Sequence, residues 1–168
     1  MKGYPVEFVF DSRISRFALW IEMRDGDKFA VLLESEKVVS ADSLSDILLH
    51  SKRLNLDSPA LVMLIIDIDL IIKLIESIIP GKIINEPHCS VLLNFINTLN
   101  DMLKTFNEEI VDAKKSHIDK IAIKLFMGNN LPSAAAAAHK TALSKNELAD
   151  LNKYIIKGAE YMRRKVLS

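Results

Sequence analysis

The side chains that could support acid–base, nucleophilic or metal chemistry are few in this sequence, and their spacing does not bring them together. His88 and Cys89 are adjacent, so on a helix they point in different directions, and no Cys-x-x-Cys or His-x-x-x-His pair occurs. Asp67 and Asp69 are two residues apart, which on a helix places their carboxylates on roughly opposite sides. The sequence also lacks a glycine-rich phosphate loop and a Gly-x-Ser-x-Gly motif. We therefore expect no catalytic, metal or cofactor site and a protein that is not an enzyme.

The clearest functional pattern lies in residues 134–153, where an alanine-rich segment, a turn and an amphipathic segment follow one another. Ala138 is the small residue at which two helices would touch, and Ala142 would take the turn position. Ser144 with Glu147 three residues later is the capping-box pattern that begins a helix. This stretch resembles the helix-turn-helix of bacterial regulators, and the resemblance covers this stretch alone.

In a helix-turn-helix, the first residues of the second helix enter the major groove of DNA, and basic side chains contact phosphates. The resemblance implies that the DNA-binding residues are Lys145, Asn146, Ala149, Lys153, Lys157, Arg163, Arg164 and Lys165. Glu147 and Asp150 lie among these positions and would repel phosphate. A plain helical hairpin, used for packing or dimerisation, therefore stays open as the alternative.

The elements that position this pattern begin with a small antiparallel sheet over the first forty residues. Three runs, residues 6–10, 16–23 and 28–34, alternate apolar and polar side chains with the period of a strand. Between the last two runs, Asp25-Gly26 can adopt the positive φ values of a tight hairpin turn. We expect a hairpin at this turn.

The rest of the chain is expected to be helical and organised around residues 59–79, which consist largely of Leu and Ile. Pro59 suits a first helical turn and Pro80-Gly81 would end the helix, so the run predicts one central buried helix. A shorter helix, capped by Ser40 or Asp42, is expected before it.

Residues 88–127 contain neither glycine nor proline and predict one very long helix, or two with a break near residues 114–116. Its apolar positions repeat in steps of four and three, namely Leu92, Ile96, Leu99, Leu103, Phe106, Ile110, Ala113 and His117. Such a seam can pack within one chain or against a second copy. We expect a homodimer through the helix at residues 92–121, with His117 in a core or at an interface. Gly128-Asn129-Asn130 predicts the helix stop, and a last helix follows at residues 145–166.

Composition sets the class of the protein. The 168 residues are 49% hydrophobic, enough for a single domain with a sizeable core. The predicted fold is α+β, mostly α: a β-hairpin region (residues 1–40), a helical core (41–127) and a C-terminal helical hairpin (128–168). Lys+Arg and Asp+Glu both number 22, so there is no global attraction to nucleic acid. The single cysteine, Cys89, and the absence of a signal peptide favour the cytoplasm, and the charges in residues 59–79 argue against a membrane span.

Two functional hypotheses follow. The first is a small cytoplasmic regulator of transcription that binds duplex DNA as a dimer through the helix-turn-helix. The alternative is a non-enzymatic module that binds another protein, in the manner of an immunity, antitoxin or inhibitor protein. An exposed apolar patch or an acidic face on the hairpin side would favour a protein partner, whereas a contiguous basic face over residues 145–165 would favour DNA.

Overall fold

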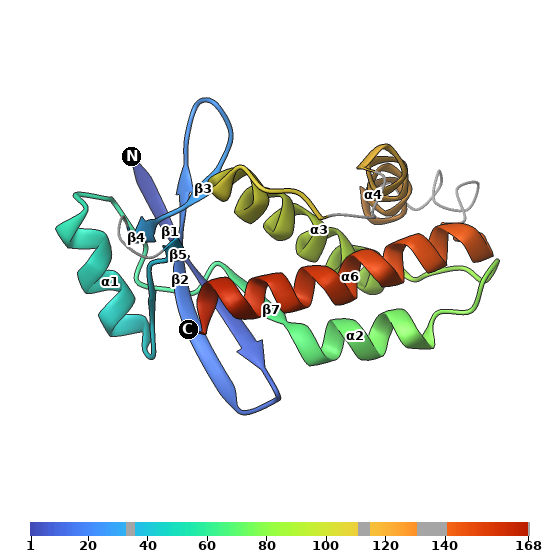
Figure 1. Ribbon diagram of the computed structural model, residues 1–168, viewed down its shortest axis with the longest axis horizontal. Helices are drawn as coiled ribbons and strands as arrows, with labels where there is room; N and C mark the ends of the chain where they lie inside the picture. The colour runs from blue at the N-terminus through green and yellow to red at the C-terminus, as the bar shows by residue number, and fades with distance from the viewer. Residues whose placement is uncertain (33–35, 111–114, 131–140, 168) are drawn as a thin grey trace. The chain divides into compact units, whose positions relative to one another are not determined.

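The computed structural model describes residues 1–32, 36–110, 115–130 and 141–167 (Figure 1). A small sheet near the N-terminus is followed by helices, which confirms the predicted α+β, mostly α class. The chain divides into two compact units. Unit 1 comprises residues 1–69, 99–109 and 159–168, and unit 2 comprises residues 70–98 and 110–158.

The sheet of unit 1 is built on a long hairpin of β1 (Lys2–Phe10) and β2 (Ile14–Glu22). The tight turn between them contains Asp11 and Ser12, both at φ 52°. Two short strands, β3 (Lys28–Phe29) and β6 (Ser40–Ala41), pair antiparallel with β2. On the other side, β7 (Leu64–Asp67) pairs with β1 in parallel, so the sheet is mixed and not purely antiparallel as predicted. A separate ribbon pairs β4 (Val31–Leu32) with β5 (Lys37–Val38).

The predicted hairpin turn between β2 and β3 is confirmed. Gly26 adopts φ 105°, and its N–H donates to the carbonyl oxygen of Met23 at 3.4 Å. The third predicted strand is interrupted at Ala30, whose N–H donates to the carbonyl oxygen of Leu19 at 2.9 Å. That interruption separates β3 from β4.

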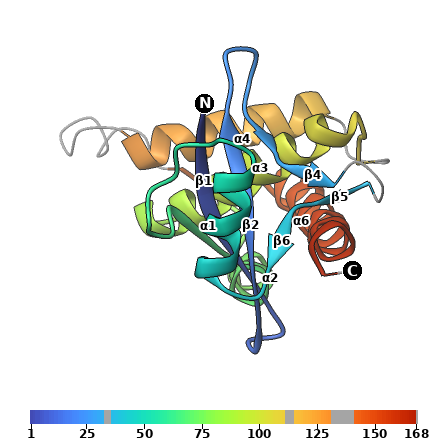
Figure 2. The same cartoon turned by 90° about the vertical axis from the view of Figure 1, so that its left-hand side faces the viewer.

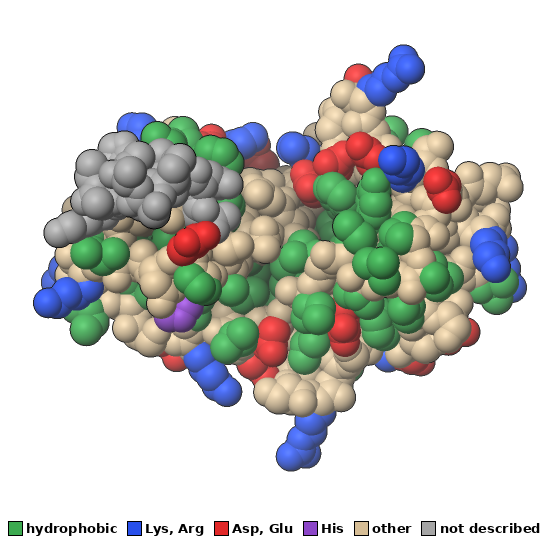
Figure 3. Space-filling view, turned by 180° about the vertical axis from the view of Figure 1, so that it is seen from behind, with side chains coloured by type: hydrophobic (Ala, Val, Ile, Leu, Met, Phe, Trp, Pro, Cys, Tyr) green, Lys and Arg blue, Asp and Glu red, His purple; other side chains and the backbone are tan. Residues whose placement is uncertain are grey.

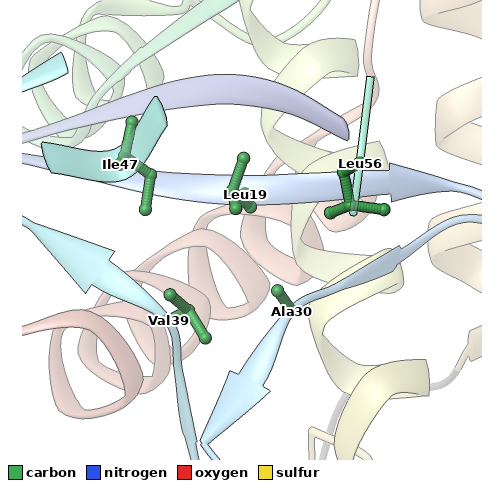
Figure 4. Close-up of a cluster of buried hydrophobic side chains, with 5 residues drawn as sticks. All are labelled: Leu19, Ala30, Val39, Ile47 and Leu56. Carbon is green, nitrogen blue, oxygen red and sulfur yellow. The ribbon is translucent and has the colours of Figure 1, made fainter. Parts of the chain in front are cut away.

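Both faces of this sheet are covered. On one face lies α1 (Leu44–Arg53), which Figure 2 shows in front of β1 and β2. The N-cap of α1 is Ser43, one residue after the expected cap Asp42 and three after Ser40. Its side chain accepts a hydrogen bond from the Asp46 N–H. Figure 4 shows the hydrophobic cluster under α1, formed by Leu19, Ala30, Val39, Ile47 and Leu56.

The opposite face carries Val6, Phe8 and Phe10, all buried. It is covered by the end of α3 (Glu86–Phe106) and the end of α6 (Lys145–Val166). The backbone N–H of Phe29 donates to Thr105 Oγ1 of α3 at 2.9 Å, which ties the sheet to that helix.

The prediction of one central helix over residues 59–79 is wrong. The segment contains the strand β7 and then α2 (Ile68–Ser77). Before the strand, the Met63 N–H donates to the carbonyl oxygen of Pro5 at 2.9 Å, so the chain already follows β1. A continuous apolar run is compatible with a buried strand as well as with a helix, and its periodicity does not separate the two.

Of the two alternatives for residues 88–127, the structure has two helices, α3 and α4 (Lys115–Asn130). The break comes earlier than expected, because Asn107 adopts φ 53°, a left-handed conformation that ends helices. Residues 92–121 therefore do not form a continuous helix that could pair with a second copy. Leu92, Ile96 and Leu99 of the seam are fully buried.

Within unit 2, α4 ends at Asn130, inside the predicted helix stop Gly128-Asn129-Asn130, and Gly128 itself still lies in the last turn of the helix. A Cβ at this position would lie 2.2 Å from Thr141 Oγ1 and 3.1 Å from Cys89 Sγ. The glycine therefore permits a close approach of the segment that precedes α6. None of the helices in the described ranges is long and apolar enough to cross a bilayer.

Candidate interfaces for nucleic acid and protein

The N-terminal half of α6 begins as predicted, with the capping box of Ser144 and Glu147. The Ser144 N–H donates to Glu147 Oε2 at 2.9 Å, and the Glu147 N–H donates to Ser144 Oγ at 3.3 Å. This cap fixes where the helix starts and so which side chains share a face. Four of the predicted DNA-binding residues, Lys145, Asn146, Ala149 and Lys153, are exposed on one face of the helix.

The two acidic residues of this stretch are directed to α4 instead. Glu147 Oε1 lies 2.6 Å from Lys124 Nζ, and Asp150 Oδ2 lies 3.1 Å from His117 Nδ1. His117 is thus half-exposed in a surface pair and not in a core or at a seam, which corrects the prediction for it. Asp150 nevertheless keeps 48% of its side chain exposed and lies four residues after Asn146 and three before Lys153, so its carboxylate borders this face.

Glu147 has a pH signature that can be measured. Burial raises its pKa, but hydrogen bonds from Lys124 and Ser144 outweigh this, and the net pKa is lowered from 4.5. Because the folded-state pKa is the lower one, the stabilisation by Glu147 is complete above about pH 4.5 and is lost as the pH falls through the folded-state value.

We expect Glu147→Gln to destabilise the protein at pH 7 by about 0.5 kcal/mol, because glutamine can keep the capping hydrogen bond from the Ser144 N–H but loses the ion pair with Lys124. Urea unfolding at pH 7 and pH 3.5 checks this, and the gap between wild type and variant should shrink at the lower pH. A gap of equal size at both values would contradict the assigned role of the carboxylate. Glu160→Gln, an exposed acid on the same helix, is the matched control.

The segment before α6 is extended. Ala142, the predicted turn residue, forms an antiparallel bridge with Ile83. The Gly81 N–H donates to the Leu143 carbonyl and the Ile84 N–H to the Thr141 carbonyl, both at 2.8 Å. The predicted first helix of the helix-turn-helix, including Ala138, lies outside the described residues.

The basic residues at the end of α6, which belong to unit 1, have partners of their own. Arg163 donates to both carboxylate oxygens of Asp11 at 2.8 Å, and this pairing lowers the pKa of Asp11. Its guanidinium also lies 5.6 Å from the centre of the Phe10 ring. Arg164 is exposed and lies over the Tyr161 ring at 5.4 Å.

Lys165 is buried, with an exposed fraction of 6%. Its Nζ lies 2.9 Å from Glu108 Oε1, 3.2 Å from the Glu36 carbonyl oxygen and 3.8 Å from the centre of the Phe106 ring. Of the predicted phosphate contacts, Lys165 is thus turned inward, Arg163 is paired, and Lys157 is half-buried. The structure does not bring the eight predicted residues onto one open basic face.

An exposed apolar surface, which the sequence did not predict, lies at the edge of the sheet in unit 1. Leu61, Met63 and Ile65 are 53%, 52% and 59% exposed. Ile65 lies in β7, and Leu61 and Met63 lie in the segment that leads into the strand. The sequence predicts a buried helix here, and because the neighbours of these residues are apolar as well, no signal in the sequence marks them as exposed.

Surface composition can be compared on the face drawn in Figure 3. Hydrophobic side chains gather there, with Asp and Glu side chains beside them. Lys and Arg side chains stand apart from one another on this face.

The remaining residues that could support chemistry are metal-ligating side chains, the single cysteine and the single tryptophan. Among the described residues there is no group of three His, Cys, Asp or Glu that could hold a metal ion. Cys89 is buried, and burial raises the pKa of its thiol. Trp20 donates to Asp101 Oδ2 at 3.1 Å, which attaches β2 to α3.

Comparison with known proteins gives no relationship: no family model, no curated protein and no solved structure matches this chain.

Proposed function

We propose that the protein acts by binding another protein and does not itself catalyse a reaction. The observation that carries this proposal is the exposed apolar run of Leu61, Met63 and Ile65 at the edge of the sheet. Exposed apolar groups that gather at one place are typical of interaction sites, because burying them on binding removes apolar surface from water. Their place on the hairpin side is the arrangement expected for a protein partner.

The ion pairs formed by basic residues of α6 also favour a protein partner over DNA. A DNA-binding face over residues 145–165 needs several unpaired cations in one row, whereas Arg163 and Lys165 form ion pairs within the chain. The formal net charge of zero adds no general attraction to phosphate.

The test is affinity purification from the native cell extract with nuclease present and a high-salt wash. We expect one protein to remain bound to the wild type and to be reduced at least tenfold with the double variant Met63→Lys and Ile65→Lys, since charging an apolar contact prevents its burial. Leu49→Lys, at a 47% exposed position of α1, is the matched control and should retain the partner. Equal retention by the double variant, with its fold intact by circular dichroism, would refute the proposal.

DNA binding is a second candidate because one observation favours it. Glu147 is held by Lys124 of α4, so its charge is compensated beside the exposed Lys145, Asn146 and Lys153, and Asp150 is the one carboxylate of the two that still borders this face. With about three phosphate contacts, the logarithm of the binding constant should fall with the logarithm of salt concentration with a slope of about −3.

The variant that tests this second candidate is Lys145→Ala with Asn146→Ala. It should abolish sequence-specific binding to duplex DNA without lowering thermal stability, because both side chains are exposed. Lys115→Ala, an exposed cation at the start of α4, is the control. Unchanged DNA binding by the double variant would exclude a recognition role for this face.

A further inference from the structure

We infer that the outer edge of β7 accepts an extended segment of the partner as an additional strand, and that this segment carries Lys or Arg beside its apolar residues. The inference rests on the proposed protein-binding function and specifies its geometry and chemistry. Its basis is the position of β7 in the sheet together with the charges around it.

The strand order is β3-β2-β1-β7, so β7 has β1 on one side and no strand on the other among the described residues. Alternate backbone N–H and C=O groups of an edge strand point away from the sheet and can pair with another chain. Edge strands are commonly protected by Lys, Pro or a bulge, but residues 60–66 contain neither Lys nor Pro, and β7 keeps an uninterrupted register with β1. Its short length is the remaining protection, and it limits the added strand to a few hydrogen bonds.

The side chains at this edge supply the apolar part of the recognition. Leu61, Met63 and Ile65 are more than half exposed, while Val62 and Leu64 are partly exposed. A strand placed beside β7 would bring its own alternate side chains against them, which is how strand addition gains specificity.

The charges identify the partner's chemistry. No Lys or Arg occurs between Arg53 and Lys73, whereas Asp57, Asp67 and Asp69 lie in that interval. Glu7 of β1 adds a fourth carboxylate, because it is the register partner of Ile65. Two cations also lie in this region: Lys2 is the bridge partner of Asp57, and Arg163 interacts with Asp69 while it pairs with Asp11. The carboxylates outnumber these cations, so the apolar edge lies in a net acidic surround that is complementary to an extended segment with cationic flanks. A second copy of this chain would bring the same acidic set, so it is the less suitable occupant.

The experiment uses the full-length protein and a defined peptide of alternating Val and Thr, five residues long, with two Lys at each end. Two matched peptides serve as controls: one has Glu in place of Lys, and the other has N-methylated backbone amides with unchanged side chains. Binding is measured by calorimetry, and the site is located by NMR shifts of the amides of residues 61–67. We expect a Kd of roughly 10 µM to 1 mM for the basic peptide and at least tenfold weaker binding of both controls.

Variants of the protein give the reciprocal test. Ile65→Lys should abolish binding of the basic peptide, and Asp57→Lys should weaken it about three- to tenfold, whereas Asp119→Lys in unit 2 should not change it. The inference is overturned if the basic peptide does not bind at 1 mM, or if N-methylation or acidic flanks leave its affinity unchanged. It is also overturned if sedimentation shows that the protein alone dimerises through this edge, in a manner abolished by Ile65→Lys.

The two levels of proposal fail separately. If a partner from the extract is lost with the Met63 and Ile65 double variant but the peptides do not bind, protein binding stands and strand addition is wrong. If no protein partner is retained by the wild type, while the basic peptide shifts the amides of residues 61–67, the edge is competent but the proposed function is wrong.

Discussion

Replacing Lys165 by alanine is expected to lower the free energy of unfolding by about 2 to 3 kcal/mol. The side chain is 6% exposed, and its ammonium pairs with Glu108 and lies over the Phe106 ring. The substitution removes the packing of the aliphatic stem and the cation–π contact, and it leaves a carboxylate without its cation. Glu108 is 38% exposed, so water relieves part of that last cost and keeps the total below the range for a fully buried pair. Urea denaturation at pH 7 measures the change.

Two control variants separate the causes. Lys165→Met keeps the stem but not the charge and should cost less than alanine. Lys153→Ala, an exposed cation on the same helix, should change stability by less than about 0.5 kcal/mol. A Lys165→Ala loss as small as that of Lys153→Ala would show that the buried pair is not stabilising.

The Gly128→Ala variant is expected to be destabilised by about 2 kcal/mol, although alanine usually stabilises a helix relative to glycine by about 1 kcal/mol. The added Cβ would lie 2.2 Å from Thr141 Oγ1 and 2.9 Å from Thr141 Cβ, closer than real atoms approach. Thr141 cannot move away easily, because its carbonyl accepts from the Ile84 N–H and its hydroxyl donates to the Lys124 carbonyl. The strain therefore has to move a backbone segment. Thermal and urea unfolding measure the loss.

The second mutation that tests this explanation is Thr141→Ala, which removes the closest atom. The double variant with Gly128→Ala should be less destabilised than the sum of the two single variants. Gly81→Ala is a contrasting control, because Gly81 has φ 75° and no atom within 4 Å of an added Cβ, so its cost comes from the backbone alone. A stabilising effect of Gly128→Ala would mean that the approach at Thr141 is looser than the structure shows.

The parts of the fold that were predictable are those in which local signals act alone. The turn at Gly26 and the cap at Ser144 each depend on residues within three or four positions of one another, and both were found. The bounds of α6 followed from the cap and from one uniform apolar stripe. In these places, local preference and tertiary structure agree.

The errors occurred where tertiary pairing decides the local structure. Residues 64–67 form a strand because β1 pairs with them, and the sequence of residues 59–79 alone contains no signal for this pairing. The end of α3 at Asn107 likewise depends on one left-handed residue in a sequence without glycine or proline. For the same reason, the apolar edge at Ile65 could not be predicted, since exposure of a residue in an apolar run depends on its neighbours in space.

The ion pairs of α6 were only partly predictable. The sequence shows that Glu147 and Asp150 lie among basic residues, but not that α4 supplies a partner for each of them. Nor does it show that Arg163 and Lys165 find carboxylates far away in the chain, at Asp11 and Glu108. Counting the Lys and Arg residues of α6 in the sequence therefore overestimates how many of them are unpaired on its surface.

The composition of unit 1 has a consequence for synthesis on the ribosome. Its sheet is complete by residue 69, but the same unit also contains residues 159–168, where Met162 and Val166 are buried. At the usual rate of translation, about 5 to 20 s separate these two segments. Throughout that interval the nascent sheet lacks the last turns of α6, so the face with Phe8 and Phe10 is incompletely covered. Newly made chains should therefore be a substrate for chaperones until residues 159–168 emerge.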